Sequence, residues 1–388
     1  MTSTTDKPQV RRPDFLVFSD DWGEHPSSCQ HIFRHIAKDH RVLWVNTIGM
    51  RNPAFTWIDV RKVFVKVAKM LGRKRTPGTA TVDVNMLVCQ PLMLPGCRSR
   101  VVRAFNARSV TRKVSALIDS IGMGEPIFVT TVPNASEYPE LLKDRKVVYY
   151  CVDDFSLWPG LDADVVREME ARIVARADCI IAVSDTLLQR LSKSGKPTRL
   201  LTHGVDLELF STPEKTELPA LKDIPRPRVG FFGLIDGRMD WDLLIPLAKQ
   251  MPEFSFVFAG PIDASAGDLP QIKNMHFIGR VTYRKLTEFV AGLEWLMLPY
   301  RTGALAEALS PLKLKEYLAT GKRIVSTPIA EVRQWPGVVA TGATVSEWVE
   351  VLNRLDCTVT TAERVKTNSR LATESWAQKS LNFLRMCG

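Results

Sequence analysis

Short apolar runs alternate with amphipathic segments along this chain, and the alternation occurs twice. Near-continuous apolar strands between helices are typical of parallel β-sheets that are covered on both faces. The predicted strands lie at 14–19, 42–46, 84–89, 127–131, 147–151 and 178–183 in the first half, and at 228–233, 255–260, 275–279, 295–299 and 323–327 in the second. We therefore expect an α/β protein with two Rossmann-like, doubly wound sheets.

Amphipathic segments separate the predicted strands, and their apolar residues repeat with the period of a helix. The clearest predicted helices are 163–177, 240–251 and 310–320. The first strand runs into the polar residues 19–22 rather than into a Gly-x-Gly-x-x-Gly turn, which disfavours a dinucleotide site.

A proline-rich break divides the chain. Residues 211–228 contain four prolines, no glycine and mixed charge, as interdomain linkers commonly do. We predict an N-terminal domain over 1–210, a C-terminal domain over 227–355, and a helical tail over 356–388 that packs back on the N-terminal domain. Two such domains face each other across a cleft, and open α/β sheets bind ligands at the carboxyl ends of their strands.

Basic residues are concentrated in one region. Residues 51–118 contain 14 Lys and Arg against two Asp and Glu, a net charge of +12, whereas the whole chain carries +10. Within it, residues 53–71 place apolar side chains near one helical stripe and basic ones mostly on other faces. Such a helix binds anionic membranes, although a core-packed helix is the commoner alternative. We expect 51–118 to contact an anionic membrane; without a nucleic-acid-binding module, no nucleic acid is expected.

Other sequence features bear on location and metals. The N-terminus is polar and basic, so we expect no signal peptide. The sequence contains no run of about 18 apolar residues, so we expect no membrane-spanning helix. The seven scattered cysteines favour free thiols in a reducing compartment. We expect a cytoplasmic protein, peripheral on the inner face of the cytoplasmic membrane. His31 and His35 have metal-ligand spacing, but exposed helix histidines are the commoner explanation, and no metal is expected.

The segment 310–321 has the features of a short anion-binding helix. It begins with Ser310 and Pro311, a good N-cap and a good first helical residue, and ends at a glycine. Lys313 in the first turn is unfavourable unless an anion is present, and helix starts bind anions. Glu316, one turn on, suits paired hydroxyls. The combination fits a nucleoside diphosphate; on chemistry alone, a solvated surface helix explains it equally well.

The run SPLKLKEYLATGKRIVSTPI resembles the nucleotide-sugar signature of family 4 retaining glycosyltransferases. It is most similar to the subgroup of teichuronic-acid and exopolysaccharide biosynthesis enzymes. Further segments resemble that subgroup in order: DFLVFSDDW, CQHIFRHIAKDHRVLWVN, VVYYCVDDFSLWPG, ADCIIAVSDTLLQRL, HGVDLELF, GFFGLIDGRMDWDLL, FVFAGP, HFIGRVTYRKL and LPYR. The resemblance implies the GT-B fold and retaining transfer of a hexose-type sugar from a nucleoside-diphosphate sugar to a lipid-linked glycan in cell-surface polysaccharide biosynthesis. It implies neither a metal nor another cofactor.

The sequence departs from the wider family at two places. That family has two glutamates with seven residues between them, and Glu316 matches the second, whereas Ala308 stands at the first. Glu307 beside it is expected to point elsewhere. The family also has a Gly-Arg pair after the first C-terminal strand, but here Gly233 is followed by leucine and the nearest cation is Arg238. Because of these departures, the segment 310–321 supports nucleotide binding more firmly than it supports any particular donor sugar.

The resemblance and the helix chemistry together assign roles to individual residues. The residues expected to bind the donor are Gly233, Arg238, Ser310, Leu312, Lys313 and Glu316. Those expected to take part in catalysis are Lys313 and Arg301, which would stabilise the leaving diphosphate, and Asp21. Those expected to bind the acceptor follow N-terminal strands or lie on the first helix: Asp20, Trp22, His31 and Asp154. For each aspartate, loop or N-cap chemistry is an equally good account.

Two other functions remain open on the sequence. A sugar-nucleotide 2-epimerase shares this architecture and would form product without an acceptor. A non-catalytic partner that binds nucleotide sugars or glycans would bind nucleotide without turnover, and the alanine at 308 favours that alternative.

Overall fold

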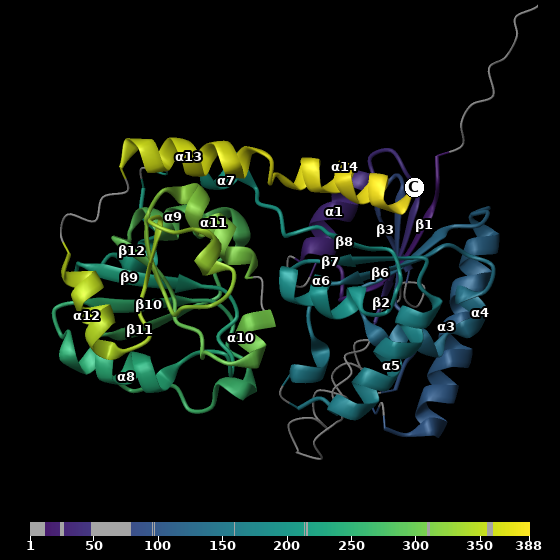
Figure 1. The fold of residues 1–388 in the computed structure, drawn as a ribbon, viewed down its shortest axis with the longest axis horizontal. Coiled ribbons are helices and arrows are strands. Elements are labelled where there is room, and N and C mark those ends of the chain that lie inside the picture. The colour runs from purple at the N-terminus through teal and green to yellow at the C-terminus, as the bar shows by residue number, and fades with distance from the viewer. Residues whose placement is uncertain are drawn as a thin grey trace, which may run out of the picture.

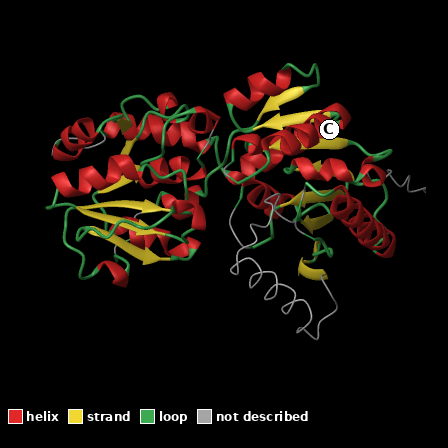
Figure 2. Cartoon of the chain, turned by 90° about the horizontal axis from the view of Figure 1, so that it is seen from below, coloured by secondary structure: helices red, strands yellow, loops and turns green. Residues whose placement is uncertain are grey.

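The chain forms two β-sheets, each covered by helices, that lie side by side (Figure 1). The computed structural model describes residues 12–23, 27–47, 79–94, 96, 98–158, 160–212, 214, 216–308, 311–354 and 360–388. Figure 2, seen from below, shows the strands of each half layered between helices. The predicted α/β architecture of two doubly wound sheets is confirmed.

The N-terminal sheet has eight strands in the order β3-β4-β2-β1-β5-β6-β7-β8. All neighbours are parallel except β3 and β4, which form an antiparallel pair. The strands are β1 (Phe15–Ser19), β2 (Val42–Asn46), β3 (Thr79–Asp83), β4 (Met86–Cys89), β5 (Ile127–Thr130), β6 (Val147–Cys151), β7 (Cys179–Ala182) and β8 (Thr198–Leu200). The helices of this half are α1 (Ser28–Ile36), α3 (Arg100–Ser120), α4 (Pro139–Leu142), α5 (Ala163–Arg176) and α6 (Asp185–Ser192), with 3₁₀ turns η1 (Pro133–Glu137) and η2 (Phe155–Leu157).

The C-terminal sheet has six parallel strands in the order β11-β10-β9-β12-β13-β14. They are β9 (Arg228–Phe232), β10 (Ser255–Ala259), β11 (Met275–Gly279), β12 (Trp295–Leu298), β13 (Arg323–Ser326) and β14 (Val339–Thr341). The helices are α7 (Leu207–Phe210), α8 (Trp241–Gln250), α9 (Leu286–Ala291), α10 (Ala304–Ala308), α11 (Leu312–Thr320) and α12 (Val345–Asn353), with 3₁₀ turns η3 (Pro219–Leu221), η4 (Ala264–Ala266), η5 (Tyr283–Lys285) and η6 (Val332–Gln334).

Local sequence explains where these elements begin and why they are buried. Every residue of β1, β6, β9 and β10 is buried, as expected for strands covered by helices on both faces. Side-chain caps start the helices: Ser27 accepts from the backbone N–H of Gln30 at α1, and Asp240 from that of Leu243 at α8. The five described cysteines, Cys29, Cys89, Cys151, Cys179 and Cys387, are buried and free.

The predicted linker packs against the C-terminal half. Leu218 and Leu221 belong to the C-terminal hydrophobic core. Arg228 is buried at the start of β9, where its guanidinium donates to the Leu221 carbonyl at 2.6 Å and pairs with Glu217 at 2.9 Å. These contacts give the proline-rich segment a fixed course.

The tail spans both halves as two helices, α13 (Thr361–Ala372) and α14 (Trp376–Cys387) (Figure 1). α13 contacts α11, and its Leu371 belongs to the C-terminal core. α14 contacts α1, where the rings of Phe383 and Phe33 meet edge to face at 5.5 Å. The part of the tail on the N-terminal half is therefore α14, whereas α13 lies on the C-terminal half.

A buried charged cluster lies where the chain crosses between the halves. Lys315 of α11 donates to the His203 carbonyl at 2.6 Å and pairs with Glu374, between the two tail helices. Lys379 of α14 pairs with the same carboxylate at 2.8 Å and donates to Thr202 Oγ1 at 2.8 Å. The lysine side chains are 5% and 7% exposed, so two buried cations share one carboxylate. We call Lys315, Glu374 and Lys379 the crossing cluster.

The sequence analysis made two predictions about membrane contact, one about residues 53–71 and one about membrane-spanning helices. The predicted amphipathic helix 53–71 lies outside the described residues. In the part of the chain that the structure describes, no helix combines the length and apolar character needed to span a bilayer.

Candidate nucleotide-sugar site

Helix α11 begins at the carboxyl edge of the C-terminal sheet, as the sequence predicts. Its first residue is Leu312, and Pro311 holds the N-cap position with φ −68° and ψ 118°. The prediction of Pro311 as the first helical residue is wrong by one position, because its ψ is extended. Ser310 lies outside the described residues, so its predicted capping and donor contacts stay predictions. Gly321 ends the helix in the left-handed conformation, φ 67°, as predicted.

Lys313 lies against Gly233 and two aromatic rings. Its ammonium donates to the Tyr300 hydroxyl at 2.5 Å and lies 4.7 Å from the centre of the Phe231 ring. Gly233 follows β9 with φ +130°, and a Cβ there would lie 2.8 Å from Lys313 Nζ. A glycine is therefore required for both the backbone conformation and the close approach of the cation. The two predicted donor residues are in contact.

Arg238 brings a second cation to the same tyrosine. Its guanidinium carbon lies 5.6 Å from the centre of the Tyr300 ring, while Lys313 Nζ lies 5.2 Å from it. Asp236 fixes the guanidinium through hydrogen bonds of 2.7 to 3.0 Å. The two cations thus converge on Tyr300, which the sequence analysis did not select.

Glu316 lies one turn along α11 and accepts a hydrogen bond from the Tyr283 hydroxyl at 2.9 Å. Burial raises the pKa of Glu316 to about 7, and the Tyr283 hydrogen bond and the charge of Lys313 oppose this rise. Burial and Glu316 itself raise the pKa of Tyr283, so the phenol stays a donor at neutral pH. The carboxylate expected to hold a ribose therefore titrates in the physiological range, and Tyr283 positions it.

The N-terminal half faces this cation pair through the loop after β6. The ring of Trp158 lies 5.6 Å from the Arg238 guanidinium carbon, across the two halves. Burial raises the pKa of Asp153 to about 6, while the charge of Arg238 opposes the rise. Asp153, rather than its neighbour Asp154, is the carboxylate that interacts with the C-terminal half.

Asp154 has a structural role instead. It caps η2, accepting from the backbone N–H of Ser156 at 3.1 Å and from its hydroxyl at 2.6 Å, and lies 3.4 Å from Arg190 Nε. The cap explanation weighed in the sequence analysis accounts for this residue. Acceptor binding by Asp154 stays a prediction.

The residues after β1 lie at the corresponding edge of the N-terminal sheet. Asp20 accepts from Ser19 at 2.7 Å and from Ser27 at 2.9 Å, which ties its carboxylate to the start of α1. Trp22 meets Trp44 edge to face at 4.8 Å. Asp21 follows Asp20 on the same turn. Acceptor binding and catalysis by these residues stay predictions, with Asp20 already serving as an anchor for the helix.

His31 is buried in the contact between the first helix and the tail. Its ring stacks on Trp376 with centroids 4.5 Å apart and 4° between the planes, and lies 5.8 Å from the Tyr283 ring. Burial lowers the pKa of His31 to about 4, with the charge of Arg34 acting in the same direction, so the imidazole is neutral at pH 7. One face of the ring packs on tryptophan, and acceptor binding by His31 stays a prediction.

Three further residues named in the sequence analysis make contacts away from the cation pair. Arg301 donates to the Met239 carbonyl at 3.3 Å and pairs with Asp242 at 3.2 Å on the exposed side of α8. Its role at the leaving diphosphate stays a prediction, whereas its neighbour Tyr300 contacts both Lys313 and Arg238. Leu312 packs against the N-terminal core. Glu307 pairs with Arg333, as the expectation that it points elsewhere required.

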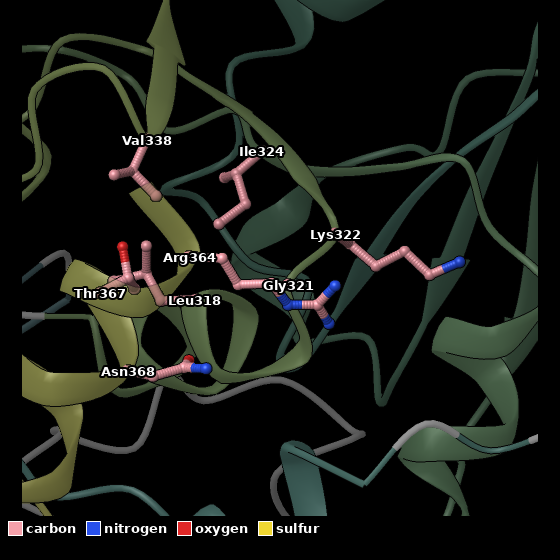
Figure 3. A pocket seen from close by; sticks show the side chains of 8 residues that line it. All are labelled: Leu318, Gly321, Lys322, Ile324, Val338, Arg364, Thr367 and Asn368. Carbon is pink, nitrogen blue, oxygen red and sulfur yellow. The ribbon is translucent and has the colours of Figure 1, made fainter. Parts of the chain in front are cut away.

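A small hollow lies at the opposite end of α11 and is distinct from this site. In Figure 3, Arg364 of α13 lies against Gly321, while Lys322 points away from the hollow. The Arg364 guanidinium would lie 2.6 Å from a Cβ at Gly321. This contact fastens the tail to α11. Within the described ranges, no group of three or more His, Cys, Asp or Glu side chains is arranged to hold a metal ion.

The pKa of Glu316 leads to a prediction for nucleotide binding. An ionised carboxylate accepts hydroxyl hydrogen bonds more strongly than its protonated form, so nucleotide affinity should fall by up to about tenfold between pH 8 and pH 6, around a midpoint near 7. Tyr283→Phe removes a hydrogen bond that favours the ionised form, so the midpoint should move to higher pH. Calorimetric titration at several pH values measures both effects.

Glu316→Gln is the control for that titration. It cannot ionise, so any remaining pH dependence belongs to the phosphates of the nucleotide. A wild-type profile that coincides with the Glu316→Gln profile would show that Glu316 does not contact the nucleotide.

Comparison with solved structures identifies the fold. The chain is similar over 96% of its length to 98% of the sucrose-phosphate synthase of Thermosynechococcus elongatus, with TM-score 0.68 and 14% identity. It is also similar, over 95% of its length and 98% of that chain, to Anabaena Alr3699/HepE, solved with UDP and glucose, with TM-score 0.63 and 13% identity. At such identities the likeness establishes the fold alone, which is the GT-B fold.

Comparison with curated protein sequences adds one relative. The chain is 31% identical over 221 residues to TuaH of Bacillus subtilis (strain 168), provisionally described as a teichuronic acid biosynthesis glycosyltransferase. The alignment covers 51% of this chain and 54% of that protein, so the chain spans about half the length of the curated relative that it matches. No family model matches the chain. The resemblance to teichuronic-acid glycosyltransferases is confirmed over the aligned part.

Proposed function

We propose that this protein transfers a sugar from a nucleoside-diphosphate sugar to a glycan acceptor in polysaccharide biosynthesis. The observation that carries the proposal is the convergence of Lys313 and Arg238 on Tyr300, beside the start of α11. Two fixed cations at a helix N-terminus suit a diphosphate. The relationship to TuaH supports the same activity.

In the proposed reaction, the C-terminal half holds the donor. Charge develops on the departing diphosphate as the anomeric carbon becomes cationic, and Lys313 and Arg238, which converge on Tyr300, would stabilise that charge. Cations fixed beforehand by Tyr300 and Asp236 need little reorganisation during the reaction, which is the main source of electrostatic catalysis. Glu316 would accept from the ribose hydroxyls, and Tyr283 keeps its carboxylate in position.

The N-terminal half would receive the acceptor, which we propose to be lipid-linked. Asp21 and Trp22 follow β1 at the carboxyl edge of the N-terminal sheet, and Asp153 follows β6 at the same edge. We propose retention of configuration, with a donor phosphate oxygen taking the proton of the acceptor hydroxyl on the face from which the diphosphate leaves. The resemblance stated above supports retention and independence of metal ions.

A screen of UDP, GDP, ADP and dTDP by thermal denaturation tests the first step. A ligand at one hundred times its Kd stabilises the native state by about 2.7 kcal/mol, which raises the melting temperature by several degrees. We expect one diphosphate to do so for the wild type and for the exposed control Lys249→Ala, but much less for Lys313→Ala. No shift with any of the four would contradict the proposal.

The matching labelled nucleotide sugar tests the reaction itself. Label should move to a membrane lipid extract, with EDTA changing the rate by less than about twofold, because the proposed leaving-group cations are side chains. Conversion of the donor without any acceptor would indicate an epimerase instead. Binding without turnover would indicate a non-catalytic partner.

A further inference from the structure

An exposed apolar surface lies on the N-terminal half, around the start of α3. Leu92 and Leu94 are 51% and 45% exposed, and Val101 and Phe105 of α3 are 79% and 42% exposed. Contiguous exposed apolar side chains of this kind commonly mark an interaction site. In Figure 1, α3 lies on the side of the N-terminal half that is turned away from the C-terminal half, so the other half does not cover it.

Hydrogen bonds hold the two parts of this surface together. The Asn106 side chain accepts from the Leu94 backbone N–H and donates to the Leu94 carbonyl, both at 2.8 Å. Ser109 donates to the Leu92 carbonyl at 2.7 Å. The backbone of the segment is thereby fixed along α3, while its leucine side chains stay exposed. The exposure is a property of the folded structure rather than of a loose loop.

Cations without acidic partners border the apolar side chains. Arg108 and Arg112 are exposed and follow Val101 and Phe105 along one face of α3, at helical spacing. Between Asp83 and Asp119 the sequence contains six Lys and Arg and no acidic residue. No ion pair joins Arg108 or Arg112 to any residue that the structure describes. We call Leu92, Leu94, Val101, Phe105, Arg108 and Arg112 the α3 patch.

The α3 patch is connected to the carboxyl edge of the N-terminal sheet, where the residues after β1 lie. The segment that carries Leu92 leaves the carboxyl end of β4, and β4, β2 and β1 are parallel neighbours. A hydrogen bond of 2.9 Å joins Gln90 to Asn46, and Asn46 accepts from the backbone N–H of Trp22 at 3.0 Å. The patch is therefore connected, residue by residue, to the edge where the acceptor is proposed to bind.

We propose that the α3 patch docks the protein on an anionic lipid bilayer, at the inner face of the cytoplasmic membrane. A bilayer interface accepts apolar side chains at the acyl boundary and pairs its phosphates with neighbouring arginines, which matches both components of the patch. A folded protein partner would need a complementary acidic and apolar face, whereas every anionic membrane presents both. The choice of a lipid-linked acceptor rests on the proposed function, but bilayer binding is independent of turnover.

Sedimentation of the full chain with vesicles tests the proposal. The wild type should bind phosphatidylglycerol vesicles and not vesicles of phosphatidylcholine alone. Each arginine near such a surface contributes about fivefold in affinity, so Arg108→Gln with Arg112→Gln should lower binding roughly 25-fold. Val101→Ser with Phe105→Ser should lower it about tenfold, including at low salt, because an apolar contribution is not screened.

Matched controls lie on the C-terminal half and on the tail. Lys222→Gln with Lys249→Gln removes the same charge from exposed positions, and Val365→Ser removes an exposed valine of α13. Both should bind as the wild type does. Patch variants that bind like the wild type, or a wild type that ignores anionic vesicles, would overturn the proposal. Thermal shifts with nucleotide, measured on the same variants, report the donor site separately.

Discussion

Replacing Lys313 by alanine is expected to slow sugar transfer by about 10² to 10³-fold, the usual cost of removing one preorganised group that stabilises developing charge. The ammonium is fixed by Tyr300 and by the close approach to Gly233, while Asp236 holds the neighbouring cation, Arg238, in its own position. The effect should fall mainly on kcat, because charge on the leaving diphosphate grows most in the transition state. Initial rates with the cognate nucleotide sugar measure it.

Two variants separate this role from structural damage. Lys313→Arg keeps the charge, but its larger head group has to fit against Gly233, so we expect an intermediate rate. Lys249→Ala removes an exposed lysine of α8 and should leave the rate unchanged. A Lys313→Ala rate within threefold of the wild type, with an unchanged melting temperature, would remove Lys313 from the proposed mechanism.

The second large effect is expected at Glu374, whose loss should destabilise the fold by about 3 kcal/mol or more. Glu374→Ala leaves Lys315 and Lys379 as buried cations without the carboxylate that pairs with both. Although burial alone would raise the pKa of Glu374, the two lysines lower it, so the carboxylate is ionised at neutral pH and its contribution is lost as the solution becomes acidic. Urea denaturation at pH 7 measures the change in the free energy of unfolding.

A matched pair of variants checks that interpretation. Glu350→Ala breaks an exposed pair with Arg354 one helical turn away, and it should cost less than about 0.5 kcal/mol. Lys379→Met added to Glu374→Ala removes one of the two unpaired cations, so it should recover part of the lost stability. Equal effects of Glu374→Ala and Glu350→Ala would show that the crossing cluster is not a buried ionic centre.

The sequence predicts those strands of this fold that coincide with a run of apolar residues. The run VLWVN forms β2 over the expected residues, but β3, β8 and β14 were missed. All three lie at a sheet edge; β8 and β14 have only three residues each, β8 carries an arginine at its centre, and the sequence of β3 is TATVD, so none shows a long apolar run. Their pairing depends on the neighbouring strand, which the local pattern does not contain.

At two places the residue next to a predicted one interacts with the cation pair. Tyr300 beside Arg301, and Asp153 beside Asp154, lie near Lys313 or Arg238. Both pairs follow the end of a strand, where the turn of the backbone, rather than the residue type, decides which side chain faces the cations. Lys313, Glu316 and Gly233 were predicted because a helix start and a strand end constrain them.

The nine residues of α11 carry both the donor contacts and the anchor of the crossing cluster. Lys313 and Glu316 face the proposed nucleotide, and Lys315 between them is bound to the His203 carbonyl and to Glu374. Because these residues lie on one short helix, a shift of Lys313 or Glu316 on nucleotide binding would also shift Lys315 at the junction of the two halves. A nucleotide that binds one relative orientation of the halves more tightly would in turn be bound more tightly when that orientation is favoured, by the same coupling free energy. The tail helices, which hold Glu374 and Lys379, would then affect the affinity for a ligand that they do not contact.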